Sequence, residues 1–188
     1  MGSRKKAYGE QELLERGWII FNKRNAVLEH RKMWKWIARR IAVDKENMHG
    51  NIWKYKNEYL TTMVLLNEDL KKEATTEEEK QFYDEKISYY RQTIVDSDCF
   101  CCRFMYQYVD HVLQFEIVSD RACKECKYLC PVVWERTTVS GTKETDAYCG
   151  TSYYGRIDNK ANNKEWKKCC KLACKIAMLP ERSIEYYV

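Results

Sequence analysis

The stretch that decides the fold is residues 13–43, LLERGWIIFNKRNAVLEHRKMWKWIARRIAV. Apolar residues recur in this stretch every seven residues, and Ile37 fills an intermediate position in the repeat. Seven residues make two turns of an α-helix, so the repeat defines one apolar helix face. The pattern predicts a helix from about residue 10 to residue 43. The repeating residues are Leu13, Ile20, Val27, Trp34 and Ile41.

Two more helical patterns follow. Apolar residues step by three or four through residues 51–73, and alternating steps of four and three continue from Tyr83 to Phe115. A period of 3.5 residues held over several heptads is typical of a helix packed along another helix. The third predicted helix, which contains Tyr83 to Phe115, can kink at residues 96–98, Asp-Ser-Asp. We expect a three-helix antiparallel bundle over residues 10–117, within a mainly α fold.

The third helix has a clear start signal at Thr76-Glu77-Glu78-Glu79. The Thr76 hydroxyl can accept a hydrogen bond from the backbone N–H of Glu79, and the Glu79 carboxylate can reach back in return. Acidic groups in a first turn also face the positive end of the helix dipole. The segment therefore predicts a capping box.

The composition agrees with long helices. The chain has 188 residues with only 7 Gly and 2 Pro, and 45% of its residues are hydrophobic. So few chain breakers argue against an all-β sandwich, and the 13% of aromatic residues argue against disorder. The 10 Cys are the unusual feature and need a separate explanation.

The pattern changes after Ser119. Residues 132–134 and 137–139, the turn 140–142 and residues 146–148 predict a β-hairpin, and residues 153–157 resemble a second short one. A last helix is expected over residues 164–179, capped by Asn162 or Asn163 and ended by Pro180. We therefore expect two domains, a helical bundle (1–118) and a Cys-rich β-hairpin and helix unit (119–188).

The spacing Cys123-Lys-Glu-Cys126 allows two thiolates to chelate one ion, and Zn²⁺ needs two further ligands to complete a tetrahedron. Cys149, followed by a glycine, is the third candidate. The fourth is sought among Cys130 and the cysteines of the last helix, Cys169, Cys170 and Cys174. The preferred ligand set for a structural zinc ion is Cys123, Cys126, Cys149 and Cys170.

A knuckle, a hairpin and a helix in that order resemble the treble-clef and zinc-ribbon families over about residues 121–175. Their usual second C-x-x-C is absent here, which is why the fourth ligand stays open. Zinc would hold the β-hairpin and helix unit together, as such families imply.

The remaining cysteines are expected to pack as small buried hydrophobes, because free Cys is among the most buried residue types. This applies above all to Cys101, Cys102 and Cys174. An alternative is a second metal cluster formed by Cys99, Cys101 and Cys102 with His111.

Basic residues gather on the predicted first helix. The formal net charge is only +5, but residues 1–60 hold 14 Lys and Arg against 7 Asp and Glu. The cations fall on one side of the helix, away from its apolar face, where they can attract phosphates, and an exposed Trp can stack on a base. The alternatives are an acidic protein partner or a solvated face paired with Glu29. The candidate binding residues are Arg24, Arg31, Lys32, Lys35, Trp36 and Arg39.

No catalytic motif is found, and the 3 His have no ligand spacing. The first residues lack the apolar run of a signal peptide, and no stretch of 18 apolar residues exists, so we expect a cytoplasmic protein without a membrane partner.

We therefore expect a non-catalytic, zinc-containing inhibitor or adaptor that binds a protein or nucleoprotein complex handling nucleic acid. In size, Lys and Cys content and Tyr and Trp usage the chain is similar to small accessory proteins of phages and mobile elements, including anti-CRISPR proteins. The alternatives are a zinc-module regulator that binds DNA or RNA directly, with Lys167, Lys168, Lys171 and Lys175 adding to the basic helix, and a small nuclease with an unrecognised site.

Overall fold

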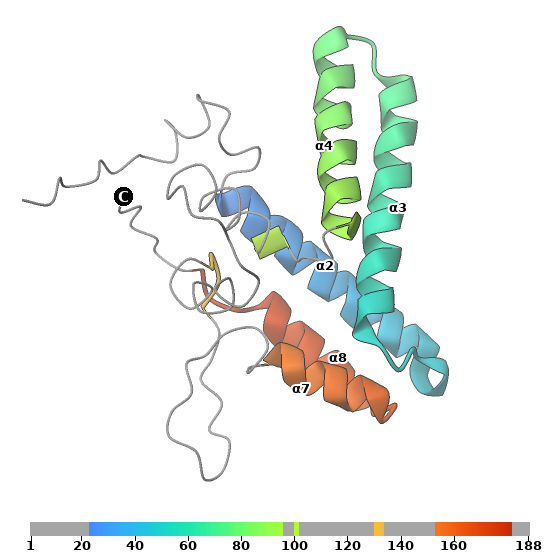
Figure 1. Cartoon of the computed structure of the whole chain (residues 1–188), viewed down its shortest axis with the longest axis vertical. Helices are drawn as coiled ribbons and strands as arrows, with labels where there is room; N and C mark the ends of the chain where they lie inside the picture. The colour runs from blue at the N-terminus through green and yellow to red at the C-terminus, as the bar shows by residue number, and fades with distance from the viewer. Residues whose placement is uncertain (1–22, 96–99, 102–129, 134–152, 182–188) are drawn as a thin grey trace, which may run out of the picture.

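The computed structural model describes residues 23–95, 100–101, 130–133 and 153–181, and these are mainly helical (Figure 1). Among them, β-pairing is limited to an isolated antiparallel bridge between Val132 and Glu181. The helices in chain order are α2 (Lys23–Asp44), the 3-10 helix η1 (Lys45–Asn47), α3 (Ile52–Glu73), α4 (Glu77–Val95), α7 (Tyr153–Asn162) and α8 (Trp166–Ala177).

Helix α2 confirms the apolar face predicted from the seven-residue repeat. Val27, Trp34 and Ile41 are all buried there. Its end at Asp44 lies one residue from the predicted end, whereas the predicted part before residue 23 lies outside the described residues. Tyr55 fixes the turn into α3, because its hydroxyl donates to Asp44 Oδ2 at 2.8 Å and accepts from the His49 backbone N–H at 3.0 Å.

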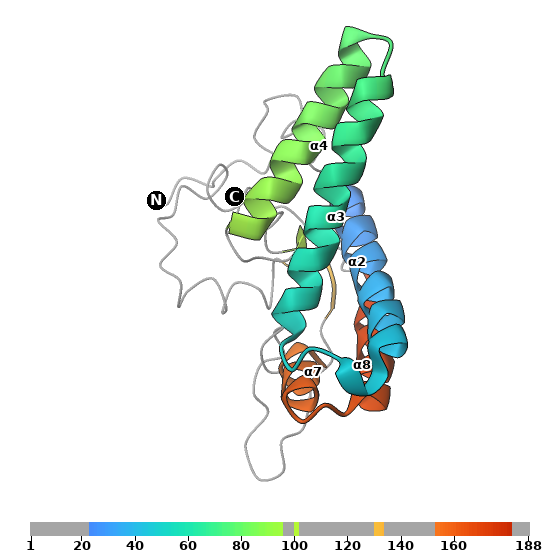
Figure 2. The same cartoon turned by 90° about the vertical axis from the view of Figure 1, so that its right-hand side faces the viewer.

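Helices α2 and α8 pack against each other in antiparallel directions (Figure 2). The Cys170 thiol donates to the Ala38 carbonyl oxygen at 3.4 Å, and Arg31 Nη2 donates to the Leu179 carbonyl oxygen at 3.3 Å. His30 is buried, with its Nε2 3.4 Å from the Ile176 carbonyl oxygen. These contacts join the start of the described chain to its end.

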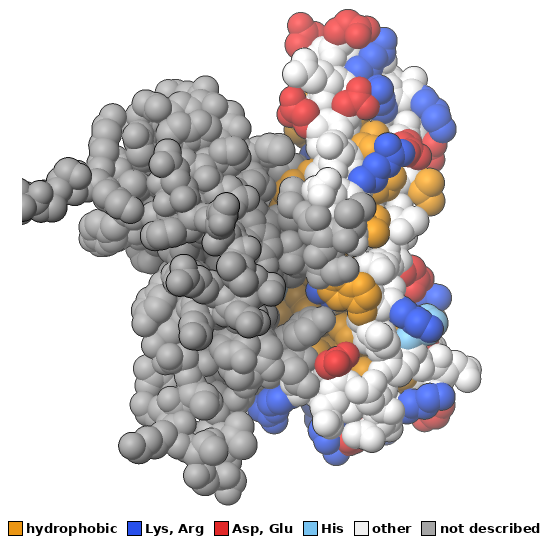
Figure 3. Space-filling model, in the orientation of Figure 1, with side chains coloured by type: hydrophobic (Ala, Val, Ile, Leu, Met, Phe, Trp, Pro, Cys, Tyr) orange, Lys and Arg blue, Asp and Glu red, His pale blue; other side chains and the backbone are white. Residues whose placement is uncertain are grey.

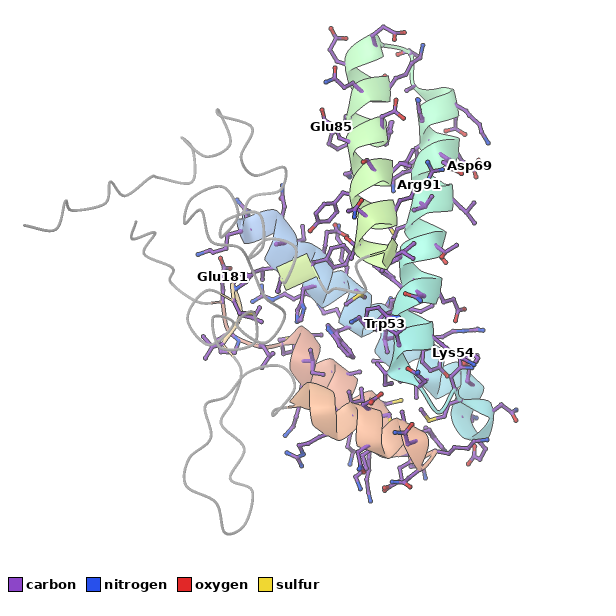
Figure 4. All side chains as sticks on the ribbon, viewed as in Figure 1. Trp53, Lys54, Asp69, Glu85, Arg91 and Glu181 are labelled. Atoms are coloured by element: carbon purple, nitrogen blue, oxygen red, sulfur yellow. The ribbon has the colours of Figure 1, made fainter. Side chains whose placement is uncertain are left out.

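Helices α3 and α4 form an antiparallel hairpin whose tip projects beyond the other described helices (Figure 1). Charged side chains of both signs follow it, with acidic groups at the tip (Figure 3). Lys71 binds Asp84 at 2.6 Å near the tip, and Arg91 reaches from α4 to Glu68 of α3 (Figure 4). This pair agrees with part of the predicted bundle, while the complete three-helix bundle stays a prediction, because α2 contacts α3 but packs more extensively against α8.

The predicted pattern of the third helix agrees with α4 as far as Val95. Ile87 and Tyr90 are buried, as are Phe100 and Cys101, which are also helical. The expected kink at 96–98 and the continuation over residues 102–117 lie outside the described residues.

The capping box predicted for α4 is confirmed. The Glu79 backbone N–H donates to Thr76 Oγ1 at 3.1 Å, and the Thr76 N–H donates to Glu79 Oε2 at 3.2 Å. The Thr75 N–H donates to the same carboxylate oxygen at 2.9 Å. These backbone N–H groups hold the pKa of Glu79 below its usual value.

We expect Thr76→Ala to lower the free energy of unfolding by about 1 kcal/mol, because the N–H of Glu79 loses its acceptor. Urea denaturation measures the change, and Thr76→Asp is the control that keeps a capping oxygen. Equal losses in both variants would contradict the capping role. The Glu79 contribution is present at neutral pH and is lost as the pH falls through the lowered pKa of its carboxyl group.

The prediction of a second short hairpin at residues 153–157 is wrong, because these residues lie in α7. Two tyrosines and a glycine resembled a strand and a turn, but Ile157 and Ala161, one helical turn apart, are both buried. The cap predicted for the last helix is also wrong. Asn162 belongs to α7, and α8 follows Glu165 with no capping bond from that side chain.

The turn between α7 and α8 explains this error. Lys164 has a left-handed φ of 53°, its N–H donates to the Ala161 carbonyl at 2.9 Å, and the Glu165 N–H donates to the Lys160 carbonyl at 2.9 Å. This is the Schellman geometry that ends a helix, formed here with Lys where Gly is usual. The asparagines before it therefore close α7 and do not open α8.

Val132 and Val133, predicted to begin the first hairpin, pair with the segment after α8. Val132 bridges to Glu181, and the Val133 N–H donates to the Pro180 carbonyl at 2.8 Å. The rest of that hairpin, residues 134–152, lies outside the described residues. The division into domains at residue 118 stays a prediction, although α2 and α8 share one hydrophobic core.

Among the described helices, none is long and apolar enough to cross a membrane.

Candidate functional site

The described structure places basic side chains from two helices on one surface. On α2, Ile37 is buried while Lys35 is exposed, and on α8, Ile176 is buried while Lys171 is exposed. The two helices pack against each other and share one hydrophobic core, and their exposed side chains point away from it. In Figure 2 the two helices lie along the right-hand edge. We name this surface the basic face: Arg24, Arg31, Lys32, Lys35 and Arg39 of α2 with Lys167, Lys168, Lys171 and Lys175 of α8.

Acidic side chains do little to neutralise this face. Helix α8 contains no Asp or Glu, and the two carboxylates of α2 are Glu29, which is buried, and Asp44, at the far end. Lys32 binds Glu29 at 2.8 Å, and Lys168 binds Glu165. The described residues contain no ion pair for four members of the face, Arg24, Lys35, Arg39 and Lys171. These four cations are therefore available to an external anion.

Trp36, predicted to be an exposed stacking residue beside the stripe, does not lie on the basic face. It is half-buried against the core, and its ring meets the ring of Tyr59 edge-on with centroids 5.7 Å apart. Residue 36 follows Lys35 by 100° around the helix, which turns it toward α3. Trp34 precedes Lys35 and lies 100° from it in the other direction, where it is buried in the core.

Glu29 is a buried carboxylate on the inward side of α2, whereas the sequence predicted it only as a partner for surface cations. Glu29 Oε2 accepts hydrogen bonds from Tyr90 Oη at 3.0 Å and Tyr59 Oη at 3.4 Å, while Lys32 Nζ binds Oε1 at 2.8 Å. Burial, followed by the nearby Glu29 charge, raises the pKa values of Tyr59 and Tyr90. Both phenols remain protonated donors, and the cluster connects α2, α3 and α4.

Three of the four preferred zinc ligands, Cys123, Cys126 and Cys149, lie outside the described residues. The fourth, Cys170, is half-buried, and its thiol donates to the Ala38 carbonyl at 3.4 Å. Burial raises the pKa of Cys170, and a charge on Cys174 would raise it further. This thiol is thus held in its protonated form.

The other cysteines differ from one another in exposure. Cys101 is buried as predicted, whereas the same prediction for Cys174 is wrong, because that thiol is exposed. Cys130 and Cys169 are buried, and burial raises the pKa of Cys169 to about 11. The alternative cluster cannot be placed, since Cys99, Cys102 and His111 lie outside the described residues. Those residues that are described contain no group of three His, Cys, Asp or Glu suited to a metal ion.

Apolar side chains are exposed on the α3–α4 hairpin, away from the basic face. The exposed fractions are 56% for Leu65, 48% for Leu66 and 51% for Phe82. Leu66 belongs to the apolar positions that step by three or four through residues 51–73, but the buried side of α3 is centred on Tyr59 and Leu60. The stepping pattern did not separate the edge of the apolar face from its centre.

No family model, curated protein or solved structure matches this chain.

Proposed function

We propose that this chain is a non-catalytic binding protein that acts as an inhibitor or adaptor on a nucleic-acid-handling protein complex, the role that anti-CRISPR proteins have. The observation that carries the proposal is the basic face. Four of its cations lack an ion pair within the described structure, and two packed helices hold their backbones in place. A rigid array of unneutralised cations favours a large anionic partner.

The exposed apolar residues of the α3–α4 hairpin support an adaptor. Four or five phosphate contacts give an affinity that falls steeply with salt, so the basic face alone would bind weakly at physiological ionic strength. A second contact with a protein component would supply the missing affinity. Leu65, Leu66 and Phe82 are exposed residues of the hairpin with the apolar chemistry for that contact.

Affinity capture from the source organism tests the proposal. We expect the tagged wild-type chain to retain a nucleoprotein complex and to change its activity, and Lys35→Glu with Arg39→Glu to lose it. The control, Lys54→Glu with Lys72→Glu, makes the same change in net charge on α3, where both lysines are exposed. The proposal is rejected if the basic-face variant and the control retain the same partners as the wild type.

A zinc-module regulator that binds DNA or RNA directly is the second candidate. The presence of Lys167, Lys171 and Lys175 on α8 favours it, because they extend the basic stripe of α2 to a second helix. Tight binding to naked nucleic acid at about 150 mM salt, with no protein partner, would favour this candidate, whereas the adaptor should bind naked nucleic acid well only at lower salt.

The zinc site belongs to both candidates, with Cys123, Cys126, Cys149 and Cys170 as the proposed ligands of a structural Zn²⁺. Sulfur donors suit this ion, and Cys170 would have to give up its proton and its bond to Ala38 to bind it. The exposed Cys174, one turn along α8, is the alternative fourth ligand.

We expect elemental analysis of the purified chain to find close to one zinc per molecule, and chelation to unfold part of the protein. Cys123→Ser and Cys170→Ser should both lose the metal, whereas Cys169→Ser should keep it. Retention of zinc by Cys170→Ser and its loss by Cys174→Ser would move the fourth ligand to Cys174. No bound metal, with all 10 thiols titratable, would end the zinc proposal.

A further inference from the structure

We propose that the basic face binds the phosphate backbone of double-stranded nucleic acid without reading its base sequence. This inference rests on the proposed function and deepens it, because it names the component of the complex that the face contacts. The arrangement of its cations in two neighbouring rows carries the argument.

The first row runs along α2 and the second along α8. Arg24 and Arg39 are 15 positions apart, a distance of about 22 Å at the rise of an α-helix, and Lys167 and Lys175 are about 12 Å apart. The axes of packed helices lie about 8–10 Å from each other. Two lines of positive charge at this separation correspond to two phosphate strands on either side of a groove, each with a charge about every 3.4 Å along the duplex.

A single strand fits this face less well, because single-strand binding relies on aromatic side chains on which bases stack. Trp36 is turned to Tyr59, as shown above. Trp166 at the start of α8 is half-buried, its Nε1 donates to Glu46 Oε1 at 3.0 Å, and Lys167 Nζ lies 5.3 Å from its ring centroid. The described part of the basic face therefore offers no exposed aromatic platform.

The side chains between the cations are also poorly suited to recognising a base sequence. Leu28 and Val43 are exposed on the outer side of α2, and neither can form a hydrogen bond with a base edge. Asn and Gln, which pair with adenine in the major groove, are represented on the described face by Asn25 alone. Contacts to phosphates position a protein on a duplex and carry no sequence information.

Fluorescence anisotropy with defined probes tests the inference on the full chain. The probes are a labelled 20-base-pair DNA duplex of random sequence, one of its single strands, an RNA duplex of the same sequence, and poly-L-glutamate as the acidic-protein surrogate. With four or five phosphate contacts, we expect log K for the duplex to fall against log salt with a slope of about −4. The single strand and poly-L-glutamate should bind at least tenfold more weakly, and the two duplexes show whether DNA or RNA is preferred.

The variant Lys35→Ala with Lys171→Ala removes one unpaired cation from each row. We expect a loss of affinity on the order of tenfold for every duplex sequence, and a slope that is less steep by about two. Lys54→Ala with Lys72→Ala makes the same change in net charge on α3 and should bind like the wild type (Figure 4 shows Lys54). Circular dichroism confirms that both variants are folded.

Three results would overturn the inference: a duplex slope near zero, equal affinity for poly-L-glutamate or the single strand, or equal losses in the basic-face and control variants. The two proposals can also fail separately. If the basic face is needed for capture of the complex but the wild type does not bind the duplex, this inference is wrong and the adaptor function stands. If the duplex is bound but no complex is captured, the adaptor function is wrong and this inference stands.

Discussion

Trp34→Ala is expected to lower the free energy of unfolding by about 3–5 kcal/mol, as is typical for removing a large aromatic side chain from a core. Trp34 is 1% exposed and lies on the buried side of α2, where it is among the largest fully buried side chains described. Its ring centroid is 6.4 Å from that of His30, which in turn contacts α8. The truncation leaves a cavity beside the α2–α8 contact.

Urea denaturation followed by circular dichroism measures this effect, and the slope of the transition shows whether it stays cooperative. Trp53→Ala is the matched control. Trp53 is half-buried at the start of α3, where Lys56 Nζ lies 3.8 Å from its ring centroid, so we expect a loss of about 1 kcal/mol. Similar losses for both tryptophans would show that the α2–α8 side of the core is not the main source of stability.

Glu29→Leu is expected to lower the free energy of unfolding by about 3 kcal/mol, because it removes the acceptor that Tyr59 and Tyr90 share. Both tyrosines are buried, so their hydroxyl groups would be left without this partner inside the protein. A buried donor that loses its acceptor costs about 1–3 kcal/mol. The apolar side chain of Leu offsets part of that loss.

A combined variant separates this explanation from a simple change of packing. Adding Tyr59→Phe and Tyr90→Phe to Glu29→Leu removes the stranded hydroxyls together with their acceptor, and should recover at least half of the lost stability. If the combined variant is less stable than Glu29→Leu alone, the hydrogen-bonded cluster does not account for the effect. Thermal and urea unfolding should agree on the order of the variants.

The helices that sequence patterns predicted well are those whose signals are local. The seven-residue repeat of Val27, Trp34 and Ile41 is the buried face of α2, and the Thr76–Glu79 box begins α4, because both depend on residues at most two turns apart. The end of α3 at Glu73 was predicted for the same reason. The region around residues 153–157 failed because tyrosines favour strands while a buried Ile and Ala one turn apart favour a helix, and tertiary packing decided in favour of the helix.

The basic face was predicted in part. Its α2 cations followed from helical periodicity, and Trp36 was misplaced because a position between two faces is decided by the neighbouring helix. The pairing of α2 with α8 had no local signal, since Ala38 and Cys170 are 132 positions apart. Glu29 was not predicted as a core residue, because a carboxylate on the edge of an apolar face resembles a solvated one until its tyrosine donors are known.

The α2–α8 pairing has a consequence for the order of folding. The α3–α4 hairpin joins neighbouring segments and can form early, whereas bringing Arg31 to Leu179 closes a loop of 148 residues. During synthesis, α2 has to wait until α8 leaves the ribosome before both sides of its core contact exist. Because the basic face combines α2 with α8, we expect the duplex binding proposed above to begin only when α8 has docked onto α2.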